Sequence, residues 1–517
     1  MAVKTKGVIA AGHPKTAEAG RLMLELGGNA FDAAIAAVFA AFVVESTLTS
    51  AGGGGFLLAH TEDHQDLLFD FFCQTPRYPK PLFDIEFYPV ELNFGGALQI
   101  FHIGKGAIAV PGALAGAFTV HQRLGKLPFT TVIEPAIDYA RNGFILNSFN
   151  EFTHQLLEPI LLGEPEGQEL YAPSGKLLEQ GDISYHHNFA QTLTYLAEKG
   201  IQDFYQGDIA HQIVKDLSSG GYLTLEDLQA YEVIVRKPLK LNYRGYELLT
   251  NPPPSSGGTL IAFALKLLES LDLKQLEWGS AEHLTLLSQV MRCTNTARKN
   301  HYDEAIYQAS LVEEFLSPAN CQTYQQELQG VCNKLGSTTH ISVMDDLGNA
   351  ASVTTSNGEG SSYIVPGTGI MLNNMLGEAD LNPQGFHHWQ PNQRLSSMMS
   401  PTLVLKNGRP EMVLGSGGSN RIRTAILQVI SNCLDFDLPI AIAVNRSRIH
   451  WENQTLDLEP LNCPEVLNKL VFADETRINL WDNLNMFFGG VHATRLSDNG
   501  ELEGVGDPRR SGVAIYS

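Results

Sequence analysis

A strand–turn–strand segment in the C-terminal half of the chain constrains the fold most strongly. Apolar and polar residues alternate on both sides of a turn at residues 345–349, and this alternation is typical of two half-buried strands joined as a hairpin. Thr338 and Ser356 each lie nine positions from Leu347, so a hairpin centred there brings them opposite one another. The sequence therefore predicts a pair of hydroxyl side chains on neighbouring strands.

Residues 16–45 predict two helices. Ala, Leu and Met recur there at helical spacing, and a break at residues 27–29 interrupts the pattern. Four consecutive glycines at 52–55 then precede an apolar strand expected at 56–59. Because glycine loses much chain entropy when it is ordered, such a run is tolerated where the backbone turns tightly or where another group approaches closely. The residues alone leave both explanations open.

The rest of the chain mixes helices and strands. Residues 150–235 are expected to be mostly helical, and further helices are expected over 259–271 and 422–432. The last 180 residues begin with strands that alternate apolar and polar positions.

The composition limits the kinds of partner. The chain has 517 residues, of which 44% are hydrophobic, enough for a large globular core. Its 35 basic and 56 acidic residues give a formal net charge of -21, which repels phosphate backbones and anionic lipid headgroups. We therefore expect small-molecule partners, no nucleic acid and no membrane.

The distribution of apolar residues favours a cytoplasmic protein. The apolar stretch near the N-terminus is much shorter than the hydrophobic region of a signal peptide. The longest apolar segment, residues 30–44, contains Asp32 and falls short of the roughly 20 residues that cross a bilayer. It is better interpreted as a buried helix.

Neither the cysteines nor the histidines indicate a metal site. The six cysteines lie far apart without a C-x-x-C pair, which favours free buried thiols over a zinc site or a disulfide framework. They are Cys73, Cys293, Cys321, Cys332, Cys433 and Cys463. Two histidine pairs, at 186–187 and 387–388, have no carboxylate at ligand spacing, and we interpret them as surface residues. We expect no metal and no cofactor.

Thr338 is the first candidate nucleophile, because the common hydrolase and nucleotide-binding motifs are absent. A threonine that begins a chain carries its own amine as a general base and needs no histidine. Inside a precursor the bond before it must first be cleaved, and the small residues Gly336 and Ser337 leave room for Thr338 to attack that carbonyl. The simpler alternative is a plain strand start, with threonine favoured for its β propensity.

Gly417 and Gly418 form the second candidate. They belong to the run GSGGSNR, which leads into the helix expected at 422–432. Backbone N–H groups at a helix start can hold a developing oxyanion, and glycines let a substrate approach them. A phosphate-binding loop is the alternative, but no Lys-Ser or Lys-Thr follows and the chain is acidic.

Ten motifs in order resemble the gamma-glutamyltranspeptidase family of N-terminal nucleophile hydrolases, over nearly the whole length. They are GHPKTAEAG, LGGNAFDAAIAA, GGGGF, VPGALAG, GGYLTLEDLQAY, NPPPSSGG, GSTTHISVMDDLGNA, GIMLNN, SPTLVL and GSGGSNRIRT. The resemblance implies an α+β fold of the αββα sandwich type. It also implies self-cleavage between Ser337 and Thr338, which divides the chain into a large subunit, 1–337, and a small subunit, 338–517, that share one core as a heterodimer.

The resemblance assigns roles at the catalytic centre. Thr338 resembles the family's nucleophile, which attacks a γ-glutamyl amide such as glutathione while its freed amine takes the proton. Ser356 matches the position whose hydroxyl hydrogen-bonds the nucleophile. Gly417 and Gly418 match the glycine pair of the oxyanion hole. The acyl group would then pass to water, an amino acid or a peptide.

The substrate-binding positions depart from the family pattern. Phe72 occupies the place of the family's arginine for the glutamyl carboxylate, and a ring replaces neither the charge nor the geometry of that arginine. Arg77 is the nearest substitute along the chain.

The remaining residues expected to bind substrate are Asn374, Glu378, Gly358 and Ser397. Asn374 belongs to an Asn-Asn pair that the family shares, but the sequence departs after it, where Glu378 keeps the acidic role on the amino-group side. Gly358 stands in place of a family asparagine, and Ser397 comes from a shifted serine pair. The resemblance therefore favours a self-processing γ-glutamyltransferase. An acylase or amidase for a more apolar acyl group and an unprocessed binding protein are the alternatives.

Overall fold

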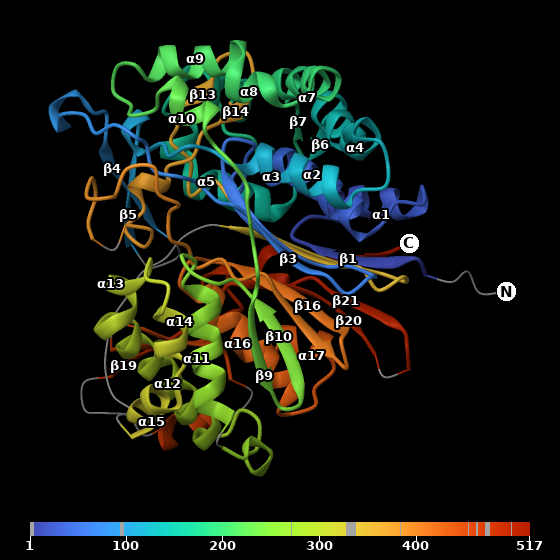
Figure 1. The fold of residues 1–517 in the computed structure, drawn as a ribbon, viewed down its shortest axis with the longest axis vertical. Coiled ribbons are helices and arrows are strands. Elements are labelled where there is room, and N and C mark those ends of the chain that lie inside the picture. Colours follow the sequence, from blue (N-terminus) through green and yellow to red (C-terminus); the bar gives the residue numbers. More distant parts are fainter. Residues whose placement is uncertain are drawn as a thin grey trace.

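The computed structural model describes residues 5–93, 98–269, 271–326, 338–382, 384–452, 454–461, 464–470, 476–497 and 499–517. Two antiparallel sheets pack face to face at the centre, and helices cover the outer face of each sheet (Figure 1). The expected αββα sandwich is confirmed.

The first sheet carries the predicted hairpin at its centre. Within the described residues, its strands run in the order β22 (Val513–Tyr516), β1 (Gly7–Ala11), β11 (Thr339–Asp345), β12 (Ala350–Ser356), β2 (Gly54–His60), β3 (Asp66–Phe71) and β8 (Ile234–Arg236). Every neighbouring pair is antiparallel. Strands from both ends of the chain therefore flank the hairpin.

The second sheet is built mainly from the C-terminal part of the chain. Its described strands run in the order β21 (Leu502–Val505), β20 (Gly490–Leu496), β16 (Arg409–Gly417), β15 (Thr402–Lys406), β10 (Tyr246–Thr250) and β9 (Leu239–Tyr243). All of these neighbours are antiparallel too.

Helices from the N-terminal half cover the first sheet. Those that contact its strands are α1 (Pro14–Glu25), α2 (Ala30–Val44) and α3 (Ala113–Leu124). Further helices of this half are α4 (Phe129–Asn142), α5 (Ser148–Leu161), α6 (Pro165–Tyr171), α7 (His187–Lys199), α8 (Gln202–Gln206), α9 (Asp208–Leu217) and α10 (Leu225–Gln229). The break at residues 27–29 separates α1 from α2, as predicted.

Asp32 explains how a charged residue fits an apolar helix. Its carboxylate accepts the N–H of Asn29, and the Asn29 side chain accepts the N–H of Asp32, so the pair caps α2. The same carboxylate accepts the N–H groups of Lys126 and Leu127. Among the described residues, no helix has both the length and the hydropathy to cross a membrane.

A second helical layer covers the other sheet. It includes α11 (Gly257–Glu269), α12 (Ala281–Ala297), α14 (Leu311–Phe315), α15 (Pro318–Gln326), α16 (Arg421–Leu434) and α17 (Ile440–Asn445). Of these, α11, α16 and α17 contact strands of the second sheet directly. Two strands near the ends of the chain, β1 and β22, pair side by side, and next to them the Lys6 N–H donates to the Ser517 carbonyl at 3.0 Å (Figure 1).

The two faces of the hairpin meet different surroundings. Ile341 and Val353 belong to the hydrophobic cluster under α2. On the opposite face, the fully buried His340 bonds Thr354 and Ser342 at 2.8 and 2.9 Å. The layer between hairpin and second sheet is therefore partly polar, and its polar groups hydrogen-bond one another.

The glycine run is explained by close backbone approach. A Cβ added at Gly53 would overlap the Ser356 carbonyl, and one added at Gly55 would overlap the Thr354 carbonyl. Gly54 pairs with Ser356 in the ladder between β2 and β12. Side chains at these positions would push β2 away from the hairpin.

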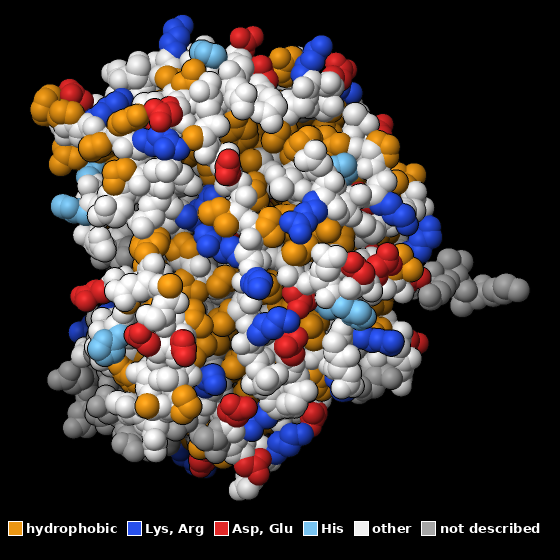
Figure 2. Space-filling model, in the orientation of Figure 1, with side chains coloured by type: hydrophobic (Ala, Val, Ile, Leu, Met, Phe, Trp, Pro, Cys, Tyr) orange, Lys and Arg blue, Asp and Glu red, His pale blue; other side chains and the backbone are white. Residues whose placement is uncertain are grey.

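The described cysteines follow the prediction from the sequence, whereas one of the histidines does not. Cys73, Cys293, Cys321 and Cys433 are buried thiols that form no disulfide, as predicted for the cysteines that the structure describes; Cys332 and Cys463 lie outside the described residues. One histidine interpretation is wrong: His186, which precedes α7, is only 4% exposed, because its ring packs against Phe144 and hydrogen-bonds the Ser184 hydroxyl. Acidic and basic side chains are interspersed on the face in Figure 2, and no cluster of metal-ligating residues occurs in the described ranges.

The packing of β16 on His340 generates a stability prediction. A Cβ at Gly415 would overlap the His340 ring, which is held from both sides by hydrogen bonds. Gly415→Ala should therefore lower the free energy of unfolding by about 1–3 kcal/mol, the usual cost of overpacking a core. Urea unfolding measures the difference. Gly408→Asn in the β15–β16 turn is the control, because nothing lies near Gly408 and asparagine is one of the residues that tolerate its φ of +74°. A Gly415→Ala variant as stable as the parent would contradict this packing.

Candidate active site

Thr338 and Ser356 lie together at one small pocket. Thr338 directly precedes β11 and Ser356 ends β12, and the pairing of Thr339 with Thr355 continues outward to them. Both line the pocket, at 4% and 2% exposure. The Ser356 hydroxyl accepts a hydrogen bond from the Gly358 N–H at 3.0 Å. The predicted pair of hydroxyl side chains is confirmed.

One wall of the pocket is apolar. Phe72 follows β3 and is fully buried, and its ring stacks on Phe56 with centroids 5.4 Å apart. The other apolar residues of the wall are Met375, Leu381, Met398, Met399 and Ile422. This wall is suited to an apolar portion of a ligand.

An arginine lies behind Phe72. The Phe72 carbonyl accepts hydrogen bonds from Arg394 and from the Tyr231 hydroxyl. The Arg394 Nε also lies 3.4 Å from the Asp70 carboxylate. Its charge is thus directed at Asp70 and at backbone carbonyls, away from the pocket lining.

Among the described residues that line the pocket, none is lysine or arginine. Arg77, the substitute suggested by the sequence, has its Nε 3.9 Å from the carboxylates of both Glu226 and Asp227. Its backbone N–H also donates to Asp227 at 2.8 Å. Arg77 therefore does not supply the missing cation, because the acidic start of α10 holds it away from the pocket lining.

Two carboxyl groups line the pocket. Glu378 is 8% exposed, and its Oε1 has no hydrogen-bond partner among the described residues. Burial, together with repulsion from Glu359 and Asp380, raises the pKa of Glu378 well above its usual value. Asp380 accepts a hydrogen bond from the Ser419 hydroxyl, and burial raises its pKa as well. An unpaired buried carboxyl group gains a partner when a ligand brings a hydrogen-bond donor or an ammonium group.

Gly358 and Asn374 lie one layer behind the lining. Gly358 has φ +65°, and an added Cβ would overlap the side chains of Asn374 and Glu378. Asn374 accepts the N–H of Glu359 at 2.9 Å and donates to the His102 carbonyl at 3.3 Å. These contacts position the acidic side of the pocket; direct substrate binding by the two residues stays a prediction.

Ser397 lines the pocket from the segment before β15. Its hydroxyl accepts the N–H of Met399 at 3.1 Å. Its carbonyl accepts the Ser256 N–H at 2.7 Å and the Ser255 hydroxyl at 3.0 Å. The proline-rich loop at 251–258 therefore holds this side of the pocket.

The glycine pair lies against Thr338. Gly417 ends β16, and an added Cβ would overlap the Thr338 carbonyl oxygen. Gly418 has φ +118°, and the next residue, Ser419, lines the pocket. Gly336 and Ser337, which precede Thr338, lie outside the described residues.

Some lining residues escaped the sequence analysis. Asp380 carries a weak signal, since it stands two residues after Glu378 in an acidic run. Met375, Met398 and Met399 carry none, because methionines at such positions are usually core residues.

The comparisons with known proteins agree with this geometry. The sequence profile described as Gamma-glutamyltranspeptidase matches residues 16–517. The glutathione hydrolase proenzyme of Escherichia coli (strain K12) is 31% identical over 540 aligned positions, which cover 98% of this chain and 90% of the relative. The Acylase ACY 1 proenzyme of Pseudomonas sp. (strain SE83) is 28% identical, and the alignment covers 99% of this chain and 94% of that relative.

A solved structure agrees with the fold over nearly the full length. The cephalosporin acylase from Bacillus halodurans superposes with a TM-score of 0.86 at 25% identity, covering 99% of this chain and 96% of that one. Two antiparallel sheets between helical layers, with a hydroxyl residue at the start of a central strand, define the class of N-terminal nucleophile hydrolases. Within that class, the chain belongs to the gamma-glutamyltranspeptidase family, which is a family of enzymes.

Glu378 generates a prediction about pH and stability. A carboxyl group whose pKa is raised on folding stabilises the folded state below its unfolded pKa, and that contribution is lost as the pH rises through the folded pKa. Glu378→Gln removes this loss, so the free energy of unfolding of the variant should exceed that of the parent by about 1–2 kcal/mol at pH 8 and by less at pH 5. Thermal unfolding at both pH values measures it. The control is Glu313→Gln, on the exposed side of α14, whose stability should differ from that of the parent by the same amount at both pH values. A Glu378→Gln variant that also showed no change with pH relative to the parent would contradict the prediction.

Proposed function

We propose that the protein is a self-processing amide hydrolase and acyltransferase whose nucleophile is Thr338. The observation that carries the proposal is the position of Thr338, which directly precedes β11, lines the pocket with Ser356 and has Gly417 against its carbonyl. A hydroxyl nucleophile, a partner hydroxyl and a close glycine backbone are the groups that acyl transfer needs.

The proposed reaction proceeds through an ester on Thr338. The Thr338 oxygen attacks the substrate's amide carbon, and the proton of the hydroxyl passes to the freed α-amine of Thr338. Backbone N–H groups at Gly417 and Gly418 stabilise the oxyanion, and Ser356 orients the nucleophile. The leaving amine takes the proton as the C–N bond breaks. Water, an amino acid or a peptide then attacks the ester and releases Thr338.

Thr338 acquires its free amine by cleavage of the bond to Ser337. In this proposal residues 1–337 and 338–517 remain associated as a heterodimer. The sheet order supports continued association. Strands β11 and β12 of the small subunit lie side by side between β1 and β2, which belong to the large subunit. The names of several relatives carry the word proenzyme.

For the substrate we propose γ-glutamyl amides, with glutathione as the representative. Glu378 supports this choice, because an unpaired buried carboxyl group beside Thr338 can pair with the α-ammonium group of a glutamyl residue. The glutathione hydrolase relatives point the same way.

A second candidate is an acylase for a more apolar acyl group. Phe72 and the methionine wall favour it, because none of the described lining residues supplies a cation for the glutamyl carboxylate. The acylases among the similar proteins also favour it.

Self-processing is tested by intact mass under denaturing conditions. The parent should appear as two fragments, and the smaller one should begin at Thr338. Thr338→Ala should remain a single chain of 56.5 kDa, because it lacks the attacking hydroxyl, whereas Thr338→Ser should be cleaved. A single uncleaved species in all three proteins would contradict the proposal.

The acyl group is tested with two anilides, γ-glutamyl-p-nitroanilide and phenylacetyl-p-nitroanilide, by p-nitroaniline release. The proposed function predicts the higher kcat/KM for the γ-glutamyl compound, and Phe72→Arg should raise that value by about tenfold or more, since it supplies a bidentate partner for the carboxylate. Phe72→Leu is the matched control, which adds no charge. A higher kcat/KM for the phenylacetyl compound in the parent would favour the second candidate.

A further inference from the structure

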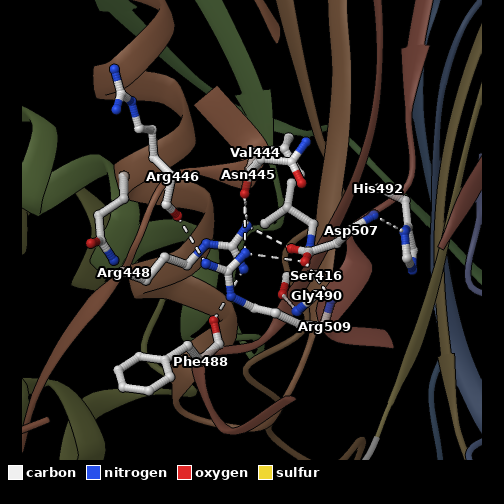
Figure 3. Close-up of polar contacts among 12 residues, drawn as sticks. Ser416, Val444, Asn445, Arg446, Arg448, Phe488, Gly490, His492, Asp507 and Arg509 are labelled. Carbon is white, nitrogen blue, oxygen red and sulfur yellow. Dashed lines mark hydrogen bonds and ion pairs between the residues drawn. The ribbon is translucent and has the colours of Figure 1, made fainter. Parts of the chain in front are cut away.

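A buried network of charged side chains surrounds the turn at residues 507–510. Figure 3 shows Arg448 and Arg509 converging on the Asp507 carboxylate. Their guanidinium nitrogens lie 2.6 and 3.2 Å from it, and the N–H of Val491 donates to it at 2.8 Å. Burial by itself would raise the pKa of Asp507, but Arg448 and Arg509 hold it at about 2. Asp507 is therefore ionised and fixed.

The network links the turn to several elements. Arg509 donates to the carboxylate of Glu459 and to the backbone carbonyls of Val444, at 3.1 Å, and Arg446, at 2.8 Å. The carbonyls belong to α17 and the residue after it. The carboxylates of Glu459 and Asp507 thus form ion pairs with Arg448 and Arg509. These pairs fix the turn in which Arg510 follows Arg509.

Arg510 connects this turn to the candidate nucleophile. It is 2% exposed, and its Nη1 donates to the Thr338 carbonyl at 2.9 Å. Glycines surround its side chain: a Cβ added at Gly417 would lie 3.1 Å from Nη1, one at Gly418 would lie 3.4 Å from Nη2, and one at Gly490 would overlap Cδ. The guanidinium group therefore lies beside both the Thr338 carbonyl and the glycine pair.

The charges that face Arg510 leave it positive. Burial lowers the pKa of Arg510 to about 10, and the carboxylates of Asp507, Glu359 and Glu45 oppose that shift, while Arg448 adds to it. The group stays protonated at neutral pH. Among these carboxylates, Asp507 is shared with Arg448 and Arg509. Burial raises the pKa of Glu45, which weakens its share of negative charge.

We propose that Arg510 is a positioning residue for Thr338: it fixes the Thr338 carbonyl so that the hydroxyl and the freed α-amine face the pocket, and its positive charge favours the neutral, proton-accepting form of that amine. The inference rests on the proposed function, because the free amine exists only after cleavage. A cation near an amine opposes its protonation, and a neutral amine is the form that takes the proton from the hydroxyl.

The test compares Arg510→Gln, which keeps a hydrogen-bond donor without charge, with Arg510→Lys, which keeps the charge. Arg495→Gln is the matched control, because Arg495 lies on β20, the strand whose Gly490 contacts Arg510, but pairs with Glu411. Cleavage is followed by intact mass, stability by thermal unfolding, and turnover from pH 5 to 9 with whichever of the two anilides the parent hydrolyses faster.

Arg510→Gln should lower kcat by about 100-fold with little change in KM, as expected for a misplaced nucleophile. The acid limb of its kcat/KM profile should move to higher pH by on the order of one unit, because the amine loses its cationic neighbour. Arg510→Lys should keep the parent's acid limb, and Arg495→Gln should match the parent throughout. An uncleaved Arg510→Gln beside a cleaved Arg510→Lys would equally support a need for charge at this position.

The failures are distinguishable. A processed, active parent whose acid limb is unchanged in Arg510→Gln would overturn this inference alone. Equal losses of cleavage and thermal stability in both Arg510 variants would assign a purely structural role and also overturn it. A parent that never acquires Thr338 as an N-terminus would overturn the proposed function and this inference together.

Discussion

Close backbone packing at the open end of the central hairpin is the constraint on which the site depends. On the β12 side the glycine run brings Gly53 against the Ser356 carbonyl, and on the β11 side Gly417 lies against the Thr338 carbonyl. Neither approach leaves room for a side chain, so both glycines are required where they stand. Because the hairpin is held between β2 and β16 in this way, Thr338 and Ser356 reach one pocket while the rest of both strands stays in the core.

The electrostatics of the pocket follow from what lies in the layer behind it. Arg394 lies behind Phe72 and is directed at Asp70, so the pocket receives an aromatic ring where a cation could have stood. In the same lining, the Oε1 of Glu378 is buried without a hydrogen-bond partner among the described residues, and burial together with repulsion from Glu359 and Asp380 raises the pKa of Glu378. Behind Thr338, Arg510 supplies the positive charge that the lining lacks. The pocket is therefore apolar and acidic within a frame of buried arginines.

Much of the fold was predictable because it depends on local patterns. The two helices before the glycine run and the hairpin register around Leu347 were predicted from spacing alone, since helical and strand periods differ and a turn fixes the register of its strands. The exposure of His186 was predicted wrongly, because a histidine pair carries no pattern that distinguishes a surface position from one covered by a helix. The pocket-lining Asp380 was missed for a similar reason: its role depends on a neighbour, Ser419, far away in the sequence.

The sequence by itself determined the chain's family and its αββα fold, and it selected Thr338, Ser356 and the glycine pair, because these features are written in contiguous motifs and short-range periodicity. Only the tertiary structure decided which charges meet the pocket. Arg77 proved to be held by Asp227, whereas Arg510, 172 residues from Thr338 along the chain, proved to contact its carbonyl. Such contacts depend on how separate strands and helices pack, and no local pattern encodes them.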